Sequence, residues 1–330
     1  MRKGILLILL ASAFVTGYSQ MVVDGGVVTV ESGASLVIEG DLTLQNSGDV
    51  EVDGDVSLKG DFINNSGTIN SNSTGTLTFD GTSAQQIGGS SATTFNCDVT
   101  INNSTGVSLN GLDETIEGDL TFTSGLLTLG TRNLRLGLNS TVTQTSGWAD
   151  VTGTGMFRKT VNASTNFIFP VGDATVYSPF TIVFNSGTFG ADPYVGVRIV
   201  DDMHPDLATS SDYITRHWIT EENDVTAQNV DVTFKYDPGD VVTGARAHSD
   251  IHAMQHHGNG WWKNHGPTNT GTHELTATGV TDAAGKDWTG ASHTAHGFDG
   301  KAFLAGAYNA GTMSTTLNSG GHIPLSQPYN

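Results

Sequence analysis

The chain has 330 residues, and its 14 Lys and Arg against 33 Asp and Glu give a formal net charge of −19. Nucleic acid is a poor partner for such a chain, because a polyanion is bound by clustered Lys and Arg, and the basic residues here are few and scattered. A single cysteine, Cys97, excludes an internal disulfide. Packing and backbone hydrogen bonds must therefore hold the fold, and we expect Cys97 to be a buried apolar residue.

The N-terminus has the three parts of a secretory signal. Positively charged residues 2–3 come first, an apolar run follows over residues 5–15, and small residues lie at 17–19. This order predicts a signal peptide over residues 1–19, cleaved before Gln20. The apolar run is shorter than the roughly 20 residues that a membrane helix needs, and no later segment approaches that length. We expect no transmembrane segment and a protein that is secreted or held at the outer cell surface.

Short runs with alternating apolar residues recur over residues 20–150, separated by Gly, Asn and Asp. Residues 36–44 match residues 50–58 at an offset of 14, and residues 39–44 return almost unchanged at 117–122. Strands this short bury a continuous apolar column only when they stack turn upon turn. The pattern predicts an all-β chain with a parallel β-helix-like repeat domain over 20–150, although an antiparallel sandwich stays open. The residues expected to face the interior are Leu36, Ile38, Leu42, Leu44, Val50, Val52, Val56 and Leu58.

Longer and more aromatic strands follow, such as residues 180–184, 194–200 and 230–236. Alternating strands between Pro, Gly and Asp turns are typical of a β-sandwich. We therefore predict a β-sandwich-like domain over residues 151–308, with Trp218 as a core residue. Residues 309–330 are expected to be an extended C-terminal segment at which the chain could be truncated.

Several segments carry a family resemblance. Residues 75–89, 99–103 and 125–130 resemble repeats of large secreted surface proteins of Bacteroidota, and residues 167–172 and 216–219 look like the sandwich that follows such repeats. The resemblance implies an adhesin-like surface protein of the kind often exported by the type IX secretion system. Members often end in a sorting domain, and this sequence reaches Asn330 without one, so it is either a fragment or attached differently.

Residue types for catalysis are present but poorly arranged. Asp201-Asp202 and Glu221-Glu222 are pairs of neighbours, and neighbouring side chains on a strand point to opposite faces, so neither pair can flank one glycosidic bond. We predict no catalytic residue and no enzymatic activity. The predicted function is a structural or adhesion protein of the cell surface. The alternatives are a carbohydrate-binding module and, less favoured, a β-helix polysaccharide lyase or glycoside hydrolase.

Histidines are concentrated in one region, where a metal site is conceivable. His252 and His256 share a face of a strand, and a hairpin turn at residues 258–260 could bring His265 towards them. No Cys assists and the spacing matches no zinc module, so solvated loop histidines are the favoured alternative. Calcium could bind aspartates at the corners of the turns, although ordinary turn aspartates explain them better and no cofactor is expected. These corner residues are Asp41, Asp55 and Asp119.

Trp261 and Trp262 follow the same turn and are the ligand-binding candidates. On a strand one ring faces the core and the other faces outward, where it could stack on a sugar. The alternative is that neighbouring loops cover both rings. The expected partners are extracellular glycans or other cell-surface proteins.

Overall fold

The structure is a computed structural model that describes residues 20–72, 75–207, 213–242, 251–258, 262–267, 271–283, 285–292 and 303–304. The predicted signal peptide (1–19), the C-terminal segment (309–330) and Trp261 lie outside the described residues. The chain is nearly all β, with 60% of residues in strands and 2% in helices. Within the described ranges, no helix has the length and apolarity needed to cross a membrane.

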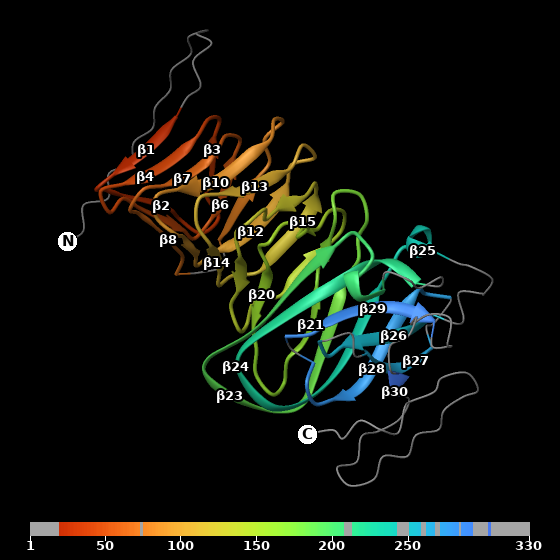
Figure 1. Cartoon of the computed structure of the whole chain (residues 1–330). Coiled ribbons are helices and arrows are strands. Elements are labelled where there is room, and N and C mark those ends of the chain that lie inside the picture. The colour runs from red at the N-terminus through yellow and green to blue at the C-terminus, as the bar shows by residue number, and fades with distance from the viewer. Residues whose placement is uncertain are drawn as a thin grey trace.

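The first half forms a parallel β-solenoid of about 7 turns, with one strand of each turn in each of three sheets. Figure 1 shows these strands stacked from the red N-terminal end towards the middle of the molecule. The predicted parallel repeat stack is thereby confirmed. Sheet A contains β1 (Met21–Asp24), β4 (Leu42–Gln45), β7 (Phe62–Asn64), β10 (Gln85–Gly89), β13 (Val107–Asn110), β16 (Leu127–Thr128), β19 (Ala149–Asp150) and β22 (Val171–Gly172).

The two other sheets complete each turn. Sheet B begins with β2 (Val27–Val30), β5 (Asp49–Val52), β8 (Thr68–Asn70), β11 (Thr94–Phe95), β14 (Glu114–Ile116), β17 (Leu134–Leu136) and β20 (Phe157–Thr160). Sheet C contains β3 (Ser35–Ile38), β6 (Asp55–Leu58), β9 (Thr76–Phe79), β12 (Asp98–Asn102), β15 (Leu120–Ser124) and β18 (Val142–Gln144). Sheet C ends at β18, whereas sheets A and B continue beyond it.

Apolar side chains of successive turns stack inside the solenoid because alternate residues of a strand point to the same face. Val50 lies beside Ile69, which lies beside Phe95, and all three are buried. Of the predicted interior residues, Leu36 is half-buried and packs against the core. The others are buried as predicted: Ile38, Leu42, Leu44, Val50, Val52, Val56 and Leu58.

Aspartates at the corners bond the turns to one another. Asp41 Oδ1 accepts a hydrogen bond of 2.9 Å from the amide of Asp61 in the next turn. Asp119 Oδ1 accepts one of 2.7 Å from the amide of Thr141. Asp55, the third corner aspartate, is exposed at the start of β6. The carboxylates of Asp41 and Asp119 thus satisfy backbone donors that the corner leaves unpaired.

The second half extends sheet B with antiparallel strands. β20 pairs with β23 (Phe180–Val200), β23 pairs with β24 (Tyr213–Lys235), and the sheet has 16 strands in all. In Figure 1, β23 and β24 are long curved ribbons beside which β26, β28 and β29 lie. The remaining elements are β21 (Asn166–Phe169), η1 (Pro205–Leu207), η2 (Pro238–Asp240), β25 (Val241–Val242), β26 (Ile251–His256), β27 (Trp262–Pro267), β28 (Glu274–Val280), β29 (Asp287–Ser292) and β30 (Phe303–Leu304).

A separate β-sandwich is not confirmed, because these strands join the solenoid sheet edge to edge. The predicted role of Trp218 is confirmed. Its side chain is fully buried, its Nε1 donates a hydrogen bond of 3.0 Å to Ser178 O, and its ring lies 4.8 Å from that of Phe234. The long alternating strands therefore build a core, but they do so by lengthening one sheet.

Arg216 joins the end of the solenoid to the antiparallel part. Its buried guanidinium lies 2.6 Å from Asp173 Oδ2, 2.9 Å from Asp240 Oδ2 and 3.0 Å from Asp201 Oδ1. Asp173 follows the last strand of sheet A, and Asp240 ends η2. Several charge-assisted hydrogen bonds to one buried guanidinium fix these segments in place.

Candidate metal centre

A cluster of histidines and aspartates lies on the antiparallel sheet, on the face opposite the main core. Strand pairing places Asp287 of β29 between Ile219 of β24 and His256 of β26, and places His256 beside Trp262 of β27. These four residues form a row across the sheet, and directly paired residues project to the same face. The segment 201–207 between β23 and β24 lies over this row and brings His204 to it.

The distances within the cluster are short. His204 Nε2 lies 3.0 Å from Asp287 Oδ2, and the rings of His204 and His256 are 4.6 Å apart. The ligand atoms of His204, His256 and Asp287 all lie within 4.8 Å of one another. Asp206 Oδ2 is 2.6 Å from His256 Nε2. Two imidazoles and the carboxylate of Asp287 therefore converge on one small volume, and Asp206 contacts it through His256.

Aromatic and apolar side chains surround the cluster. The ring of Trp262 lies 4.9 Å from that of His204 and 4.7 Å from that of His256. His217 packs its ring 4.9 Å from His204 and has its Nδ1 3.0 Å from Asp202 O. A small apolar core beside the cluster is formed by Leu207, Met254, Trp262 and Ala291. His204 is only 5% exposed, so little water reaches its ring.

These surroundings favour the ionisation states that metal ligands need. Burial lowers the pKa of His256, more than Asp206 and Asp287 raise it. Burial also lowers the pKa of His217. For Asp287, burial acts to raise the pKa, but the hydrogen bond with His204 and the nearby imidazoles outweigh it and hold the pKa below its usual value. The lowered pKa values of His256 and Asp287 favour a neutral imidazole and an ionised carboxylate, the forms that bind a metal ion.

The histidines predicted as metal ligands do not come together as one set. His256 belongs to the cluster, whereas His252 places its Nδ1 2.9 Å from Asn264 Oδ1. His265 lies on the other face of the sheet, where its Nε2 is 2.9 Å from Gln255 Oε1 and burial lowers its pKa to about 4. β26 and β27 pair antiparallel, and His256 pairs with Trp262, which puts His265 on the face of Gln255.

Of the two tryptophans predicted to bind a ligand, the structure describes Trp262. Trp262 is 3% exposed and packs within the cluster, so its ring is not a platform for a sugar. Trp261 lies outside the described residues. Of the other histidines of this region, His257 has its Nδ1 3.4 Å from Asp282, and His273 packs against Tyr236.

Sequence reasoning missed His204, His217 and Asp287. His204 and Asp287 are 83 residues apart, and they meet because β29 inserts between β24 and β26 in the sheet. Nothing in the local alternation of the strands encodes that order. One signal was available, since residues 201–206 contain three aspartates and a histidine in a short stretch.

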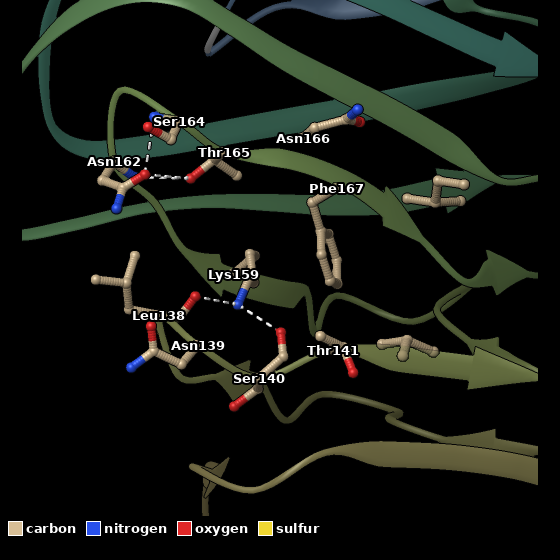
Figure 2. A pocket seen from close by; sticks show the side chains of 12 residues that line it. Leu138, Asn139, Ser140, Thr141, Lys159, Asn162, Ser164, Thr165, Asn166 and Phe167 are labelled. Carbon is tan, nitrogen blue, oxygen red and sulfur yellow. Dashed lines mark hydrogen bonds between the residues drawn. The ribbon is translucent and has the colours of Figure 1, made fainter.

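A pocket of about 430 Å³ lies at the end of sheet C, between residues 138–142 and residues 162–168 (Figure 2). Among the described residues that line the pocket, Lys159 is the only titratable one. Its Nζ donates hydrogen bonds to the carbonyls of Gly137, Leu138 (2.9 Å) and Ser140 (2.8 Å). The amine thus holds a turn in place, and the pocket offers no pair of acid and base.

The adjacent carboxylates contact different partners; Glu221 and Glu222 lie in β24 as neighbours on a strand, whereas Asp201 and Asp202 follow the end of β23. Glu221 bonds Arg158, whereas Glu222 accepts a hydrogen bond of 2.9 Å from Gln228 Nε2. Asp201 contacts Arg216, and Asp202 accepts a hydrogen bond from the amide of Met203.

Comparison of the chain with family models, curated proteins and solved structures gives no match.

Proposed function

We propose that the chain is a structural or adhesion protein of the cell exterior, with the solenoid as a stiff support for the antiparallel part. The observation that carries the proposal is the set of side-chain hydrogen bonds between successive turns. Gln45 donates to Asp24 (3.1 Å), Thr68 to Asp49 (2.8 Å) and Asn110 to Gln86 (2.6 Å). Polar side chains on the outer faces therefore bond along the stack.

Such bonding favours a support over a reaction site. In a solenoid each turn contacts only its neighbours, so bonds between turns stiffen the stack along its axis. Asn133 Nδ2 donates a bond of 2.6 Å to Asp113 in the same manner, near the far end of the stack. Carboxylates held in this way are not free to act as an acid and base on a substrate.

An extracellular location is part of the proposal. It is supported by the order of charged, apolar and small residues over 1–19. The carbohydrate-binding alternative depends on Trp261, because Trp262 is buried. The enzymatic alternatives lack support from the pocket of Figure 2, whose described lining holds Lys159 but no carboxylate.

The test uses the chain from Gln20 to Asn330 in two assays. The first measures binding to a glycan array and to cell-wall and matrix proteins, with the chemically unfolded chain as the control. The second measures release of reducing ends or unsaturated products from a polysaccharide panel. We expect binding that the unfolded chain lacks, and no product release. Product release that disappears when one acidic residue is replaced would overturn the proposal.

A further inference from the structure

We propose that His204, His256 and Asp287 form a binding site for one divalent transition-metal ion of the zinc type. Two imidazole nitrogens and a carboxylate oxygen are the ligands that zinc takes in many protein sites. Calcium and magnesium prefer oxygen ligands alone, and copper(I) prefers sulfur, so the residues present favour a borderline ion. The inference is independent of whether the chain serves in adhesion.

The distances fit such an ion after small side-chain rotations. With bonds of about 2.0–2.2 Å, two ligands of a tetrahedral ion lie about 3.3–3.5 Å apart. His204 Nε2 and Asp287 Oδ2 are already 3.0 Å apart, and the three ligand atoms lie within 4.8 Å of one another. His256 and Asp287 are held side by side by strand pairing, so only their side chains need to move.

Two further groups lie beside the three ligands. Asp206 Oδ2 lies 2.6 Å from His256 Nε2 but is not among the ligand atoms that lie within 4.8 Å of one another, so it is a neighbour of the site. His217 packs against the ring of His204, with its Nδ1 directed to the carbonyl of Asp202. A hydrogen bond of this kind to a backbone carbonyl fixes an imidazole tautomer and leaves the other ring nitrogen as a lone-pair donor.

Metal binding would displace a proton. The amide of Asp206 donates to His204 Nδ1 at 3.2 Å, which leaves the ring proton on Nε2, where it bonds Asp287. An ion bound to Nε2 takes the place of that proton, and a neutral ring then carries its proton on Nδ1. The amide of Asp206, which lies in η1, must then turn away from Nδ1. One ion would therefore fasten segment 201–207 to β26 and β29.

A network of His and Asp hydrogen bonds without a metal is the competing explanation. It accounts for the contact between His204 and Asp287, but it requires only one pair. His256 is a second imidazole that this pair does not require, and its ligand atom lies within 4.8 Å of those of His204 and Asp287. The two explanations differ in whether zinc binds with one-to-one stoichiometry.

The experiment uses the chain from Gln20 to Asn330, stripped with a chelator and titrated with zinc chloride by calorimetry and equilibrium dialysis. We expect one ion per chain, a higher melting temperature with zinc, and visible absorption of tetrahedral type when cobalt(II) replaces zinc. His204→Gln and His256→Gln should each weaken zinc binding by about 100-fold or more, since each removes a ligand. His204 lies outside the strands, so its variant tests the site even where Asp287→Asn does not fold.

The matched controls are His252→Gln and His265→Gln, which remove imidazoles bonded to Asn264 and Gln255 instead. Both should bind zinc like the unmodified chain. The proposal is overturned if the stripped chain binds no stoichiometric zinc, or if folded His204→Gln and His256→Gln bind it with unchanged affinity. Circular dichroism of each variant establishes that it is folded.

Discussion

The carboxylate of Glu114 accepts a hydrogen bond of 2.5 Å from the backbone amide of Thr93, which lies in the preceding turn of the solenoid. Both residues are buried, and Glu114 Oε1 has no hydrogen-bond partner among the described residues. Burial raises the pKa of Glu114 to about 7, although the bonds from Thr93 act to lower it. The solenoid thus encloses an acid whose charge is unfavourable in the folded state.

This pKa predicts a pH-dependent stability. The folded chain holds the proton of Glu114 up to about pH 7 and the unfolded chain loses it near its ordinary 4.5, so the free energy of unfolding falls as the pH rises through this window. The loss should reach up to about 3 kcal/mol above pH 7. Glu114→Gln should remove that fall, as measured by urea unfolding at pH 5 and pH 8. Glu31→Gln, at an exposed glutamate, is the control and should retain it.

Leu44 tests the interior of the solenoid. It is fully buried in sheet A, whereas Val37 is 50% exposed on the outer face of sheet C. Leu44→Asp places an unpaired charge among apolar side chains and should unfold the neighbouring turns, because an uncompensated buried charge costs many kcal/mol. Val37→Asp should change the free energy of unfolding by no more than about 0.5 kcal/mol. Equal melting temperatures of the two variants would contradict the assignment of faces.

The interior of the solenoid could be predicted from the sequence because it depends on local alternation. Leu42, Leu44, Val50 and Val52 repeat with period two, and that period alone determines which side chains share a face. The antiparallel half depends instead on which edges pair. Residues 180–200 alternate as they would in a sandwich, but β23 pairs with β20 and so continues sheet B. Alternation is the same in both arrangements.

The candidate site was predictable only in part for the same reason. His256 could be assigned to a face of its strand, and the hairpin after it was signalled by glycines. The partner of His256, Asp287, belongs to a strand that inserts between two others. His265 lies on the face opposite His256 because His256 pairs with Trp262, and successive residues after Trp262 point to opposite faces. A shift of the pairing by one residue would place His265 on the same face as His256.

Gly125 and Gly130 distinguish crowding from backbone strain. Both have positive φ, +81° at Gly125 and +59° at Gly130. A Cβ at Gly125 would overlap the carbonyl oxygen of Asn103 in the preceding turn, whereas a Cβ at Gly130 meets nothing within 4 Å. Gly130→Ala should cost about 1–2 kcal/mol from the left-handed backbone alone. Gly125→Ala should cost clearly more in the same guanidinium titration, and an equal cost would show that the turns can separate there.

Cys97 provides a reporter of opening in the solenoid. It is the single cysteine of the chain, it is 2% exposed, and burial raises the pKa of its thiol to about 12. Since the thiolate is the reactive form, the folded chain should react with iodoacetamide at pH 8 only as fast as it opens. The chain in guanidinium should react at once. Rapid stoichiometric labelling of the folded chain would contradict the burial of this side chain.

Lys159 connects β20 to the turn before β18. Its ammonium bonds three carbonyls, those of Gly137, Leu138 and Ser140, and lies 5.2 Å from the ring of Phe167 (Figure 2). Lys159→Met keeps the length of the side chain but leaves three buried acceptors without their donor. We expect the free energy of unfolding at pH 7 to fall by about 2–3 kcal/mol. Lys235→Met, at an exposed lysine, should change it little.

The same residue gives a second pH dependence of opposite sign. Burial lowers the pKa of Lys159 from 10.5 to about 8, so between these values the unfolded chain holds a proton that the folded chain has lost. Stability relative to Lys159→Met should therefore rise with pH over this window. The three carbonyls favour the ammonium, so the rise should be smaller than the about 3 kcal/mol that the pKa difference alone implies. Guanidinium unfolding of both chains at pH 7.5 and pH 10 measures it, and a difference that falls with pH would show that the ammonium is stabilised in the fold.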